Sequence, residues 1–287
     1  MKLLVMGAVV VASALGVFLV RSWSPCPLFF RQPVSAQVNL VSGSDGTFTH
    51  RESGVVLVRV PEGQFLRGAG NDDVEAREWI ERPQHHVSIR APFFLARTEL
   101  TRGQWYKVMG WYPADPCAGG IGDDHPVHGL TIREIKPFLS KSGFRLPTED
   151  EWEYAARAGT LSPRYGSIDR IAWHNENPAV PVGAEEAWKR WDYTKPPKAI
   201  ATKEPNPLGL YDMYGNVSEY VGTLVFEYHS DAEQPRWVVE FPGTCLHVIR
   251  GGSVASPSEA CRASWREWLG SDEPTLVGFR VACDSGR

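Results

Sequence analysis

Apolar and polar residues alternate along several short stretches of the chain, and a period of two is typical of β-strands with one buried face. The stretch 55–70 predicts a strand, a turn at 61–63 and a second strand, and 85–101 predicts another pair of strands. Further strands are predicted at 221–226 and, close to the C-terminus, at 277–283. Regular strands are therefore short, and loops connect them over much of the chain.

Apolar residues take helical spacing in three places. Helices are predicted at 100–109, with Thr101 as its N-cap, and at 132–141. The strongest helical signal is FRLPTEDEWEYAARAG at 144–159, where Thr148 and Glu151 have the spacing of a capping box.

The acidic residues Glu149, Asp150 and Glu151 in the first turn of this third helix suit the positive end of the helix dipole. A capping role accounts for them, so we interpret this helix as scaffold and not as an acid–base site.

The longest uncharged apolar run lies at the N-terminus, at Leu3–Val20, and is flanked by basic residues. Its length is at the lower limit for a membrane span and is long for a signal-peptide core. Residues 1–20 are therefore predicted to be an uncleaved anchor, with a cleaved signal as the alternative. Residues 21–53 are interpreted as a tether and 54–287 as an extracytoplasmic domain, either periplasmic or extracellular.

Composition and charge exclude one class of partner. Of the 287 residues, 43% are hydrophobic and 11% aromatic, which is ample for a core. The net charge is −4, and no run of Lys or Arg stands out, so nucleic acid is not an expected partner. Contact with a membrane is expected only through the N-terminal segment.

Five cysteines occur in the chain, namely Cys26, Cys117, Cys245, Cys261 and Cys283. Export would permit disulfides, and the four in the predicted domain allow three pairings that the sequence does not distinguish. The chain has no CxxC motif and no Cys/His cluster with zinc spacing.

The densest group of candidate ligands is LGLYDMYGNVSEY at 208–220. Asp212 and Glu219 are hard oxygen donors, and Gly215 and Asn216 between them favour a tight turn. Such a turn can direct both carboxylates and nearby carbonyls at one point, as Ca²⁺ requires. The alternative is an ordinary turn before a strand, with Asp212 as a cap, and spacing alone leaves both open.

Four segments in order resemble the formylglycine-generating enzyme, or sulfatase-modifying factor, family. They are FRLPTEDEWEYAARAG (144–159), GLYDMYGNVSEY (209–220), RGGS…CR (250–262) and GFRVA (278–282). With weaker matches upstream, the resemblance covers about residues 54–283. It implies a single α+β domain with a C-type-lectin-like fold and little regular secondary structure.

The family resemblance also implies a Ca²⁺ site in the 208–220 loop. Its ligands would be the side chain of Asp212, the carbonyls of Gly215 and Val217, and the carboxylate of Glu219. A second family site would fall near 175–192, where the sequence departs too far to assign ligands.

Authentic members of the family resemble copper oxidases that bind Cu(I) through two cysteines, three and eight residues beyond the serine of GGS. That serine is Ser253 here, and Cys261 lies eight residues on, but the position three residues on is Ser256. Because two soft thiolates suit Cu(I) and a serine hydroxyl does not, copper oxidase chemistry is predicted to be absent. Ser218 is a second departure, since the family tends to have tryptophan there.

Cys261 has three interpretations from the sequence. It could form a disulfide with Cys117, Cys245 or Cys283, or it could be a buried structural thiol. It could also be a reactive thiol, although no supporting base is evident in the sequence.

Two functions of different classes follow. The first is a membrane-anchored, Ca²⁺-stabilised module that binds, regulates or matures an extracytoplasmic protein or peptide. The second is an oxidoreductase of the same family, either a formylglycine-generating oxidase or one similar to the pyoverdine-maturation protein. Its altered site would use Ser253, Ser256, Cys261, Arg262 and Arg266.

Overall fold

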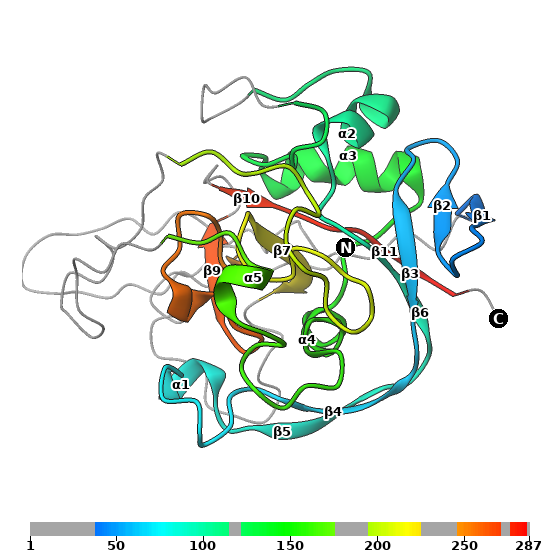
Figure 1. Cartoon of the computed structure of the whole chain (residues 1–287). Coiled ribbons are helices and arrows are strands. Elements are labelled where there is room, and N and C mark those ends of the chain that lie inside the picture. The colour runs from blue at the N-terminus through cyan, green and yellow to red at the C-terminus, as the bar shows by residue number, and fades with distance from the viewer. Residues whose placement is uncertain (1–37, 115–121, 176–194, 225–245, 271–275, 286–287) are drawn as a thin grey trace, which may run out of the picture.

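Short strands in three sheets form most of the regular structure, with short helices between them. The computed structural model describes residues 38–114, 122–175, 195–224, 246–270 and 276–285, and Figure 1 shows their arrangement. The strands are β1 (Leu40–Ser42), β2 (Phe48–His50), β3 (Val56–Val60), β4 (Gly63–Arg67), β5 (His85–Ile89), β6 (Phe93–Ala96), β7 (Ser218–Leu224), β8 (Leu246–Arg250), β9 (Arg266–Gly270), β10 (Val277–Gly278) and β11 (Ala282–Asp284). The helices are α1 (Glu78–Glu81), α2 (Arg102–Met109), α3 (Ile132–Ser142), α4 (Glu149–Arg157) and α5 (Ile168–Ile171).

The largest sheet joins the two ends of the domain. Its order is β1-β2-β3-β6-β11, so the last strand lies beside β6 with Cys283 opposite Phe94. A second sheet has the order β10-β7-β8-β9, and its β10–β7 pair is parallel. The remaining pair is β4 with β5. The sheets therefore bring the C-terminal segment against strands from the first third of the chain.

The strands predicted within 55–70 and 85–101 are confirmed, but their pairing is not the local one. The strand β3 pairs with β6, and β4 pairs with β5. In Figure 1 the two pairs follow one another around a bend. Pro61 and Pro92 lie at this bend. Proline has no N–H to donate to a ladder, so the ladder breaks there into two sheets.

The described part of the predicted tether packs on the domain. Strands β1 and β2 both fall within 21–53, and β2 pairs with β3 at Phe48–Leu57 and Thr49–Val56. The predicted domain boundary at residue 54 therefore divides a sheet. It is misplaced because the alternating pattern of such short strands is too weak to identify them in the sequence.

The three predicted helices are confirmed as α2, α3 and α4, and each starts with a capping box. The N-caps are Thr101, Thr131 and Thr148, and each accepts a hydrogen bond from a backbone N–H three residues on. In the core, Trp105 of α2 stacks on Phe138 of α3, with 5.4 Å between ring centroids. The N-cap residues thus fix where α2 and α3 begin. The starting residue of each helix determines which side chains face the core, and here these aromatic rings do.

Parts of the sequence analysis lie outside the described ranges. These parts are the predicted anchor or signal at 1–20 together with Cys26, Cys117 and Cys245. Within the described ranges, no helix has the length and apolar character needed to span a bilayer.

A buried histidine in β8 makes the stability of the fold sensitive to acid. The side chain of His247 is 1% exposed, and among the described residues its Nε2 has no hydrogen-bond partner. Its ring lies against Tyr220 of β7, and Lys136 of α3 is the charged group that acts on it. Burial, with a smaller contribution from Lys136, lowers the pKa of His247 to about 4 from 6.5.

We expect a His247→Leu variant to lose this acid sensitivity. Above pH 6.5 the ring is neutral in both the folded and unfolded states, so it contributes no pH dependence. Between pH 6.5 and 4 only the unfolded state takes up the proton. The free energy of unfolding of the wild type therefore falls by up to about 3 kcal/mol over this range, and that of the variant does not. Urea unfolding across this pH range measures the difference. Curves that stay parallel would contradict the expectation, and the exposed His86→Leu variant should match the wild type.

Candidate functional site

The loop at 208–220 makes the tight turn that its sequence predicts. Asp212, Gly215 and Asn216 all have positive φ, at 54°, 75° and 56°. Main-chain bonds fix the turn on both sides, because Gly215 N donates to Gly251 O and Asn216 N donates to Trp173 O. The loop then leads directly into β7, which places Glu219 inside the domain.

Glu219 is held by a buried cation. Its carboxylate accepts hydrogen bonds from the guanidinium of Arg280, at 2.6 Å from Nη2 and at 2.8 and 2.9 Å from Nε. The indole Nε1 of Trp152 donates to the other side of the carboxylate at 2.7 Å. All three side chains are at most 1% exposed, so this is a desolvated ion pair with its remaining lone pairs satisfied.

The same arginine also ties the loop to the large sheet. Its Nη2 donates to the carbonyls of Tyr211 and Asp212, each at 3.0 Å, and its Nη1 donates to the carbonyl of Ala96 at 3.2 Å. Arg280 therefore binds one carboxylate and three main-chain oxygens. Carboxylate and main-chain carbonyl oxygens are also the ligands that a bound metal ion would gather, so Arg280 takes the place that such an ion would have.

A third carboxylate, missed in the sequence analysis, completes the cluster. Glu99 is fully buried and accepts hydrogen bonds from Val217 N at 3.0 Å and from Asn216 Nδ2 at 2.7 Å. Burial, followed by the nearby Asp212 and Glu219, raises the pKa of Glu99 well above its usual value. A lone glutamate in the predicted strand stretch 85–101 gives no sequence signal for this role, because its partners are far away along the chain.

Asp212 lies at the other end of the proposed ligand set. Its Oδ2 accepts a hydrogen bond from Ala201 N at 2.7 Å, and burial raises its pKa to about 6. Asp212 is thus a buried acid with one oxygen already committed to the main chain.

The residues predicted to bind calcium supply oxygen ligands, which suit a Ca²⁺ ion. The contacts of Glu219, however, do not suit such an ion. Both of its oxygens already accept from Arg280 and Trp152, which leaves Asp212 and the carbonyls of Gly215 and Val217. Ca²⁺ takes about six to eight oxygens. Within the described residues, no group of three or more His, Cys, Asp and Glu is arranged to hold a metal. Calcium in this loop stays a prediction, and the second site near 175–192 lies almost wholly outside the described ranges.

The predicted catalytic residues Ser253, Ser256 and Cys261 share one closed region. The exposed fractions of their side chains are 2%, 0% and 0%. The hydroxyl of Ser256 accepts from Ser253 N at 2.8 Å and lies 3.1 Å from the Ser253 hydroxyl. Cys261 is a free thiol, and burial is the main cause that raises its pKa to about 12.

The free thiol at Cys261 agrees with the structural-thiol interpretation. Cys283 is likewise a free and buried thiol, so the two do not form a disulfide with each other.

The two arginines assigned to the alternative oxidase site are used in buried ion pairs. Arg262 Nη1 contacts Asp73 at 2.6 Å and Glu81 at 2.8 Å. Arg266 Nε lies 2.7 Å from Glu149. Both therefore hold segments of the domain together.

This pairing corrects the interpretation of Glu149 as a helix cap. Arg67 and Arg250 also contact Glu149, at 2.8 and 3.3 Å. Burial alone would raise the pKa of Glu149, but Arg266, Arg67 and Arg250 outweigh it and hold the pKa at about 2. Glu151 has the predicted capping role and also pairs with Arg145 at 2.6 Å.

Comparisons with known proteins found relatives in sequence and in fold. The formylglycine-generating enzyme of Streptomyces coelicolor is 32% identical over 240 residues, which cover 77% of this chain and 74% of that enzyme. The "Chaperone protein LppX" of Paenibacillus barcinonensis is 26% identical over 215 residues, 58% of this chain and 74% of that protein. The structure of PvdO from Pseudomonas aeruginosa superposes with a TM-score of 0.65 at 25% identity, over 83% of this chain and 98% of PvdO.

The likeness to PvdO confirms the predicted α+β fold of the formylglycine-generating enzyme type. The domain described as "Sulfatase-modifying factor enzyme 1-like domain" matches residues 46–285, which is most of the chain. The chain therefore belongs to the sulfatase-modifying factor family.

Proposed function

We propose that this chain is an exported, membrane-anchored family member that binds an extracytoplasmic protein or peptide and regulates or matures it. We further propose that it is not a copper-dependent formylglycine oxidase. The observation that carries the proposal is the closed arrangement of Ser253, Ser256 and Cys261. A site for thiol oxidation needs an exposed, ionisable sulfur, and this region presents none.

The chemistry of Cu(I) supports the proposal that the chain is not a copper-dependent formylglycine oxidase. Cu(I) prefers two soft thiolate ligands, and the position of one of them is Ser256, whose hydroxyl already accepts from Ser253 N. The other, Cys261, is fully buried, and burial is the main cause that raises its pKa to about 12. A thiol that stays protonated is a poor nucleophile.

Two observations support the proposal that the chain is membrane-anchored and acts on another protein or peptide. The relative from Paenibacillus barcinonensis is named a chaperone, a name that denotes action on another protein. The apolar run at Leu3–Val20 supports anchoring, and release of the full chain from membranes only by detergent is the test of that part.

A second candidate function is oxidation by an altered site. The observation that favours it is the 32% identity to the Streptomyces coelicolor formylglycine-generating enzyme. In that case Cys261 would have to become exposed and ionised when substrate binds.

We expect no aldehyde when the purified chain is supplied with copper, oxygen and a cysteine-containing sulfatase peptide. Mass spectrometry of the peptide measures the product, and the Streptomyces coelicolor enzyme is the positive control. Because the serine at 256 removes one thiol, the Ser256→Cys variant is the matched comparison. Aldehyde formation by the wild type that is lost in Cys261→Ser would overturn the proposal and establish the second candidate.

A further inference from the structure

Exposed aromatic side chains gather at the end of α2 and just after it. Tyr106, Trp111 and Tyr112 are 44%, 43% and 44% exposed. The other large apolar side chains that are exposed in the described ranges are aliphatic and lie in separate segments. Scattered apolar residues are ordinary on a protein surface, whereas a contiguous group marks a surface that contacts something else. We call these three residues the aromatic face.

Contacts within the domain fix the aromatic face without covering it. The rings of Tyr106 and Tyr112 are stacked, with 4.5 Å between their centroids. Trp111 packs edge-on against the buried Trp105, with 5.3 Å between ring centroids. The Tyr112 hydroxyl donates to Asp123 Oδ1 at 2.7 Å. Because the rings remain exposed after these contacts, they are held in position and still accessible, which lowers the entropic cost of docking.

The charges around the aromatic face balance one another. The guanidinium carbon of Arg102 lies 5.4 Å from the centroid of the Tyr112 ring, and Lys107 is exposed on the same helix. Asp123 and its neighbour Asp124 are exposed as well. Net charge therefore does not select an anionic or a cationic partner. Tyr and Trp rings beside long basic side chains are typical of the boundary between lipid and water, where the rings enter the headgroup region and the cationic ends stay in water.

The described chain begins close to α2. Asn39 O accepts from Arg51 N at 3.1 Å, and Gly54 O accepts from Gln104 Nε2 of α2 at 3.5 Å. Residues 21–37 separate this point from the predicted anchor, and a chain of that length spans at most about 60 Å even when fully extended. An anchored copy therefore keeps its own membrane within reach of the side that carries α2. Such linkage lets a surface of weak affinity stay bound.

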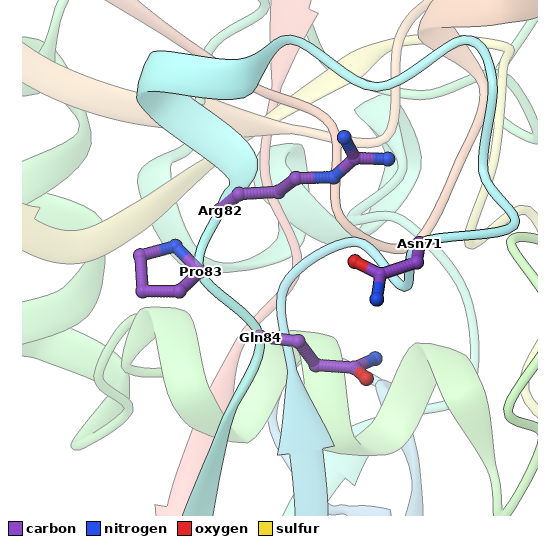
Figure 2. A pocket seen from close by; sticks show the side chains of 4 residues that line it. All are labelled: Asn71, Arg82, Pro83 and Gln84. Carbon is purple, nitrogen blue, oxygen red and sulfur yellow. The ribbon is translucent and has the colours of Figure 1, made fainter.

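The opposite end of the domain offers a different surface. In Figure 1 α2 lies at the top of the domain, and β4 and β5 lie at the bottom. Figure 2 shows a polar cavity beside their connection, lined by Asn71, Arg82, Pro83 and Gln84. Arg82 Nη2 donates to the carbonyls of Gly70 and Asp73, each at 3.0 Å. Polar groups gain nothing from contact with lipid, so the aromatic face suits the membrane and this end does not.

We propose that the aromatic face docks on the lipid–water interface of the membrane that carries the anchor. The inference rests on the membrane anchoring proposed above, and it adds which side of the domain meets the lipid. Docking is driven by burial of the three rings, so it needs neither anionic lipid nor low salt.

The test uses the full chain reconstituted in phosphatidylcholine vesicles, with and without bromine on the upper acyl carbons of the lipid. Bromine quenches an indole only at short range. The emission of the wild type minus that of Trp111→Phe isolates the contribution of Trp111. We expect brominated lipid to abolish this contribution, and we expect the same loss in high salt.

Tyr106→Glu is the decisive variant, because it places a charge in the aromatic face at an exposed position of α2. We expect the Trp111 contribution to escape quenching in this variant, with an unchanged unfolding midpoint. Val74→Glu is the matched control, since Val74 is a 93% exposed apolar residue in the loop between β4 and α1. It should be quenched as the wild type is.

Sedimentation of the vesicles scores anchoring separately. A chain that sediments while its Trp111 emission is unquenched overturns docking and leaves anchoring intact. Release of Tyr106→Glu but not of the wild type supports docking and overturns anchoring. A wild type that stays in the supernatant overturns both. Quenching that requires anionic lipid, or that persists in Tyr106→Glu, also overturns the inference.

Discussion

Replacement of Arg280 by methionine is expected to lower the free energy of unfolding by about 3–5 kcal/mol. The guanidinium is the only cation that contacts Glu219 among the described residues, and Asp212 and Glu99 lie close by. Its loss would leave the buried Glu219 carboxylate without a compensating charge, and the carbonyls of Ala96, Tyr211 and Asp212 would lose this donor. Urea unfolding followed by tryptophan fluorescence measures the change.

The matched control is Arg170→Met. Arg170 pairs with Glu204 at 2.7 Å, but the two side chains are 69% and 53% exposed, so water replaces the lost contact. The Arg170→Met substitution should lower the free energy of unfolding by less than about 1 kcal/mol. If Arg280→Met loses no more than the control does, Arg280 is not the cation that holds the loop.

The same samples test the calcium prediction. An ion that binds only the folded state raises the unfolding midpoint, so chelation would lower the midpoint of the wild type if the loop holds Ca²⁺. An unchanged midpoint after chelation, together with metal analysis that finds no calcium, would leave Arg280 as the charge that organises the loop.

Gly215→Ala is expected to lower the free energy of unfolding by about 2–5 kcal/mol, as the sum of left-handed backbone strain and overpacking. A Cβ at this position would lie 2.1 Å from the carbonyl oxygen of Trp173 and 2.8 Å from its carbonyl carbon. Both are backbone atoms, so the turn and the segment that carries Trp173 would have to separate. The unfolding midpoint in urea is again the measurement.

Gly209→Ala separates the two causes. Gly209 lies in the same loop with a φ of 78°, and a Cβ there would meet no neighbouring atom of the described residues within 4 Å. The variant should lose about 1 kcal/mol through backbone strain alone. Equal losses in the two variants would show that the close approach to Trp173 does not matter.

The features found from the sequence are those that depend on neighbouring residues. Thr148 and Glu151 are three residues apart, so the capping box is visible without any tertiary information. The turn at Gly215 and Asn216 is likewise local, because it depends on the backbone preferences of those two residues.

The features missed depend on partners that only the fold brings together. Glu219 is 61 residues from Arg280, and Glu149 is 117 residues from Arg266. The sequence shows a carboxylate in each case, but whether it caps a helix, binds an ion or pairs with an arginine depends on which cation is buried beside it. Glu99 is the clearest example, because its donors come from the 208–220 loop more than a hundred residues later.

Arg280 and β11 come after all the other strands of the large sheet in the sequence, and this order has a consequence for biosynthesis. Arg280 donates to Ala96, 184 residues earlier, and β11 completes the large sheet against β6. Until Arg280 has been synthesised, the buried Glu219 carboxylate lacks its counter-charge. The domain therefore cannot close before β11 is made, and truncation upstream of residue 280 would yield a product for proteolysis.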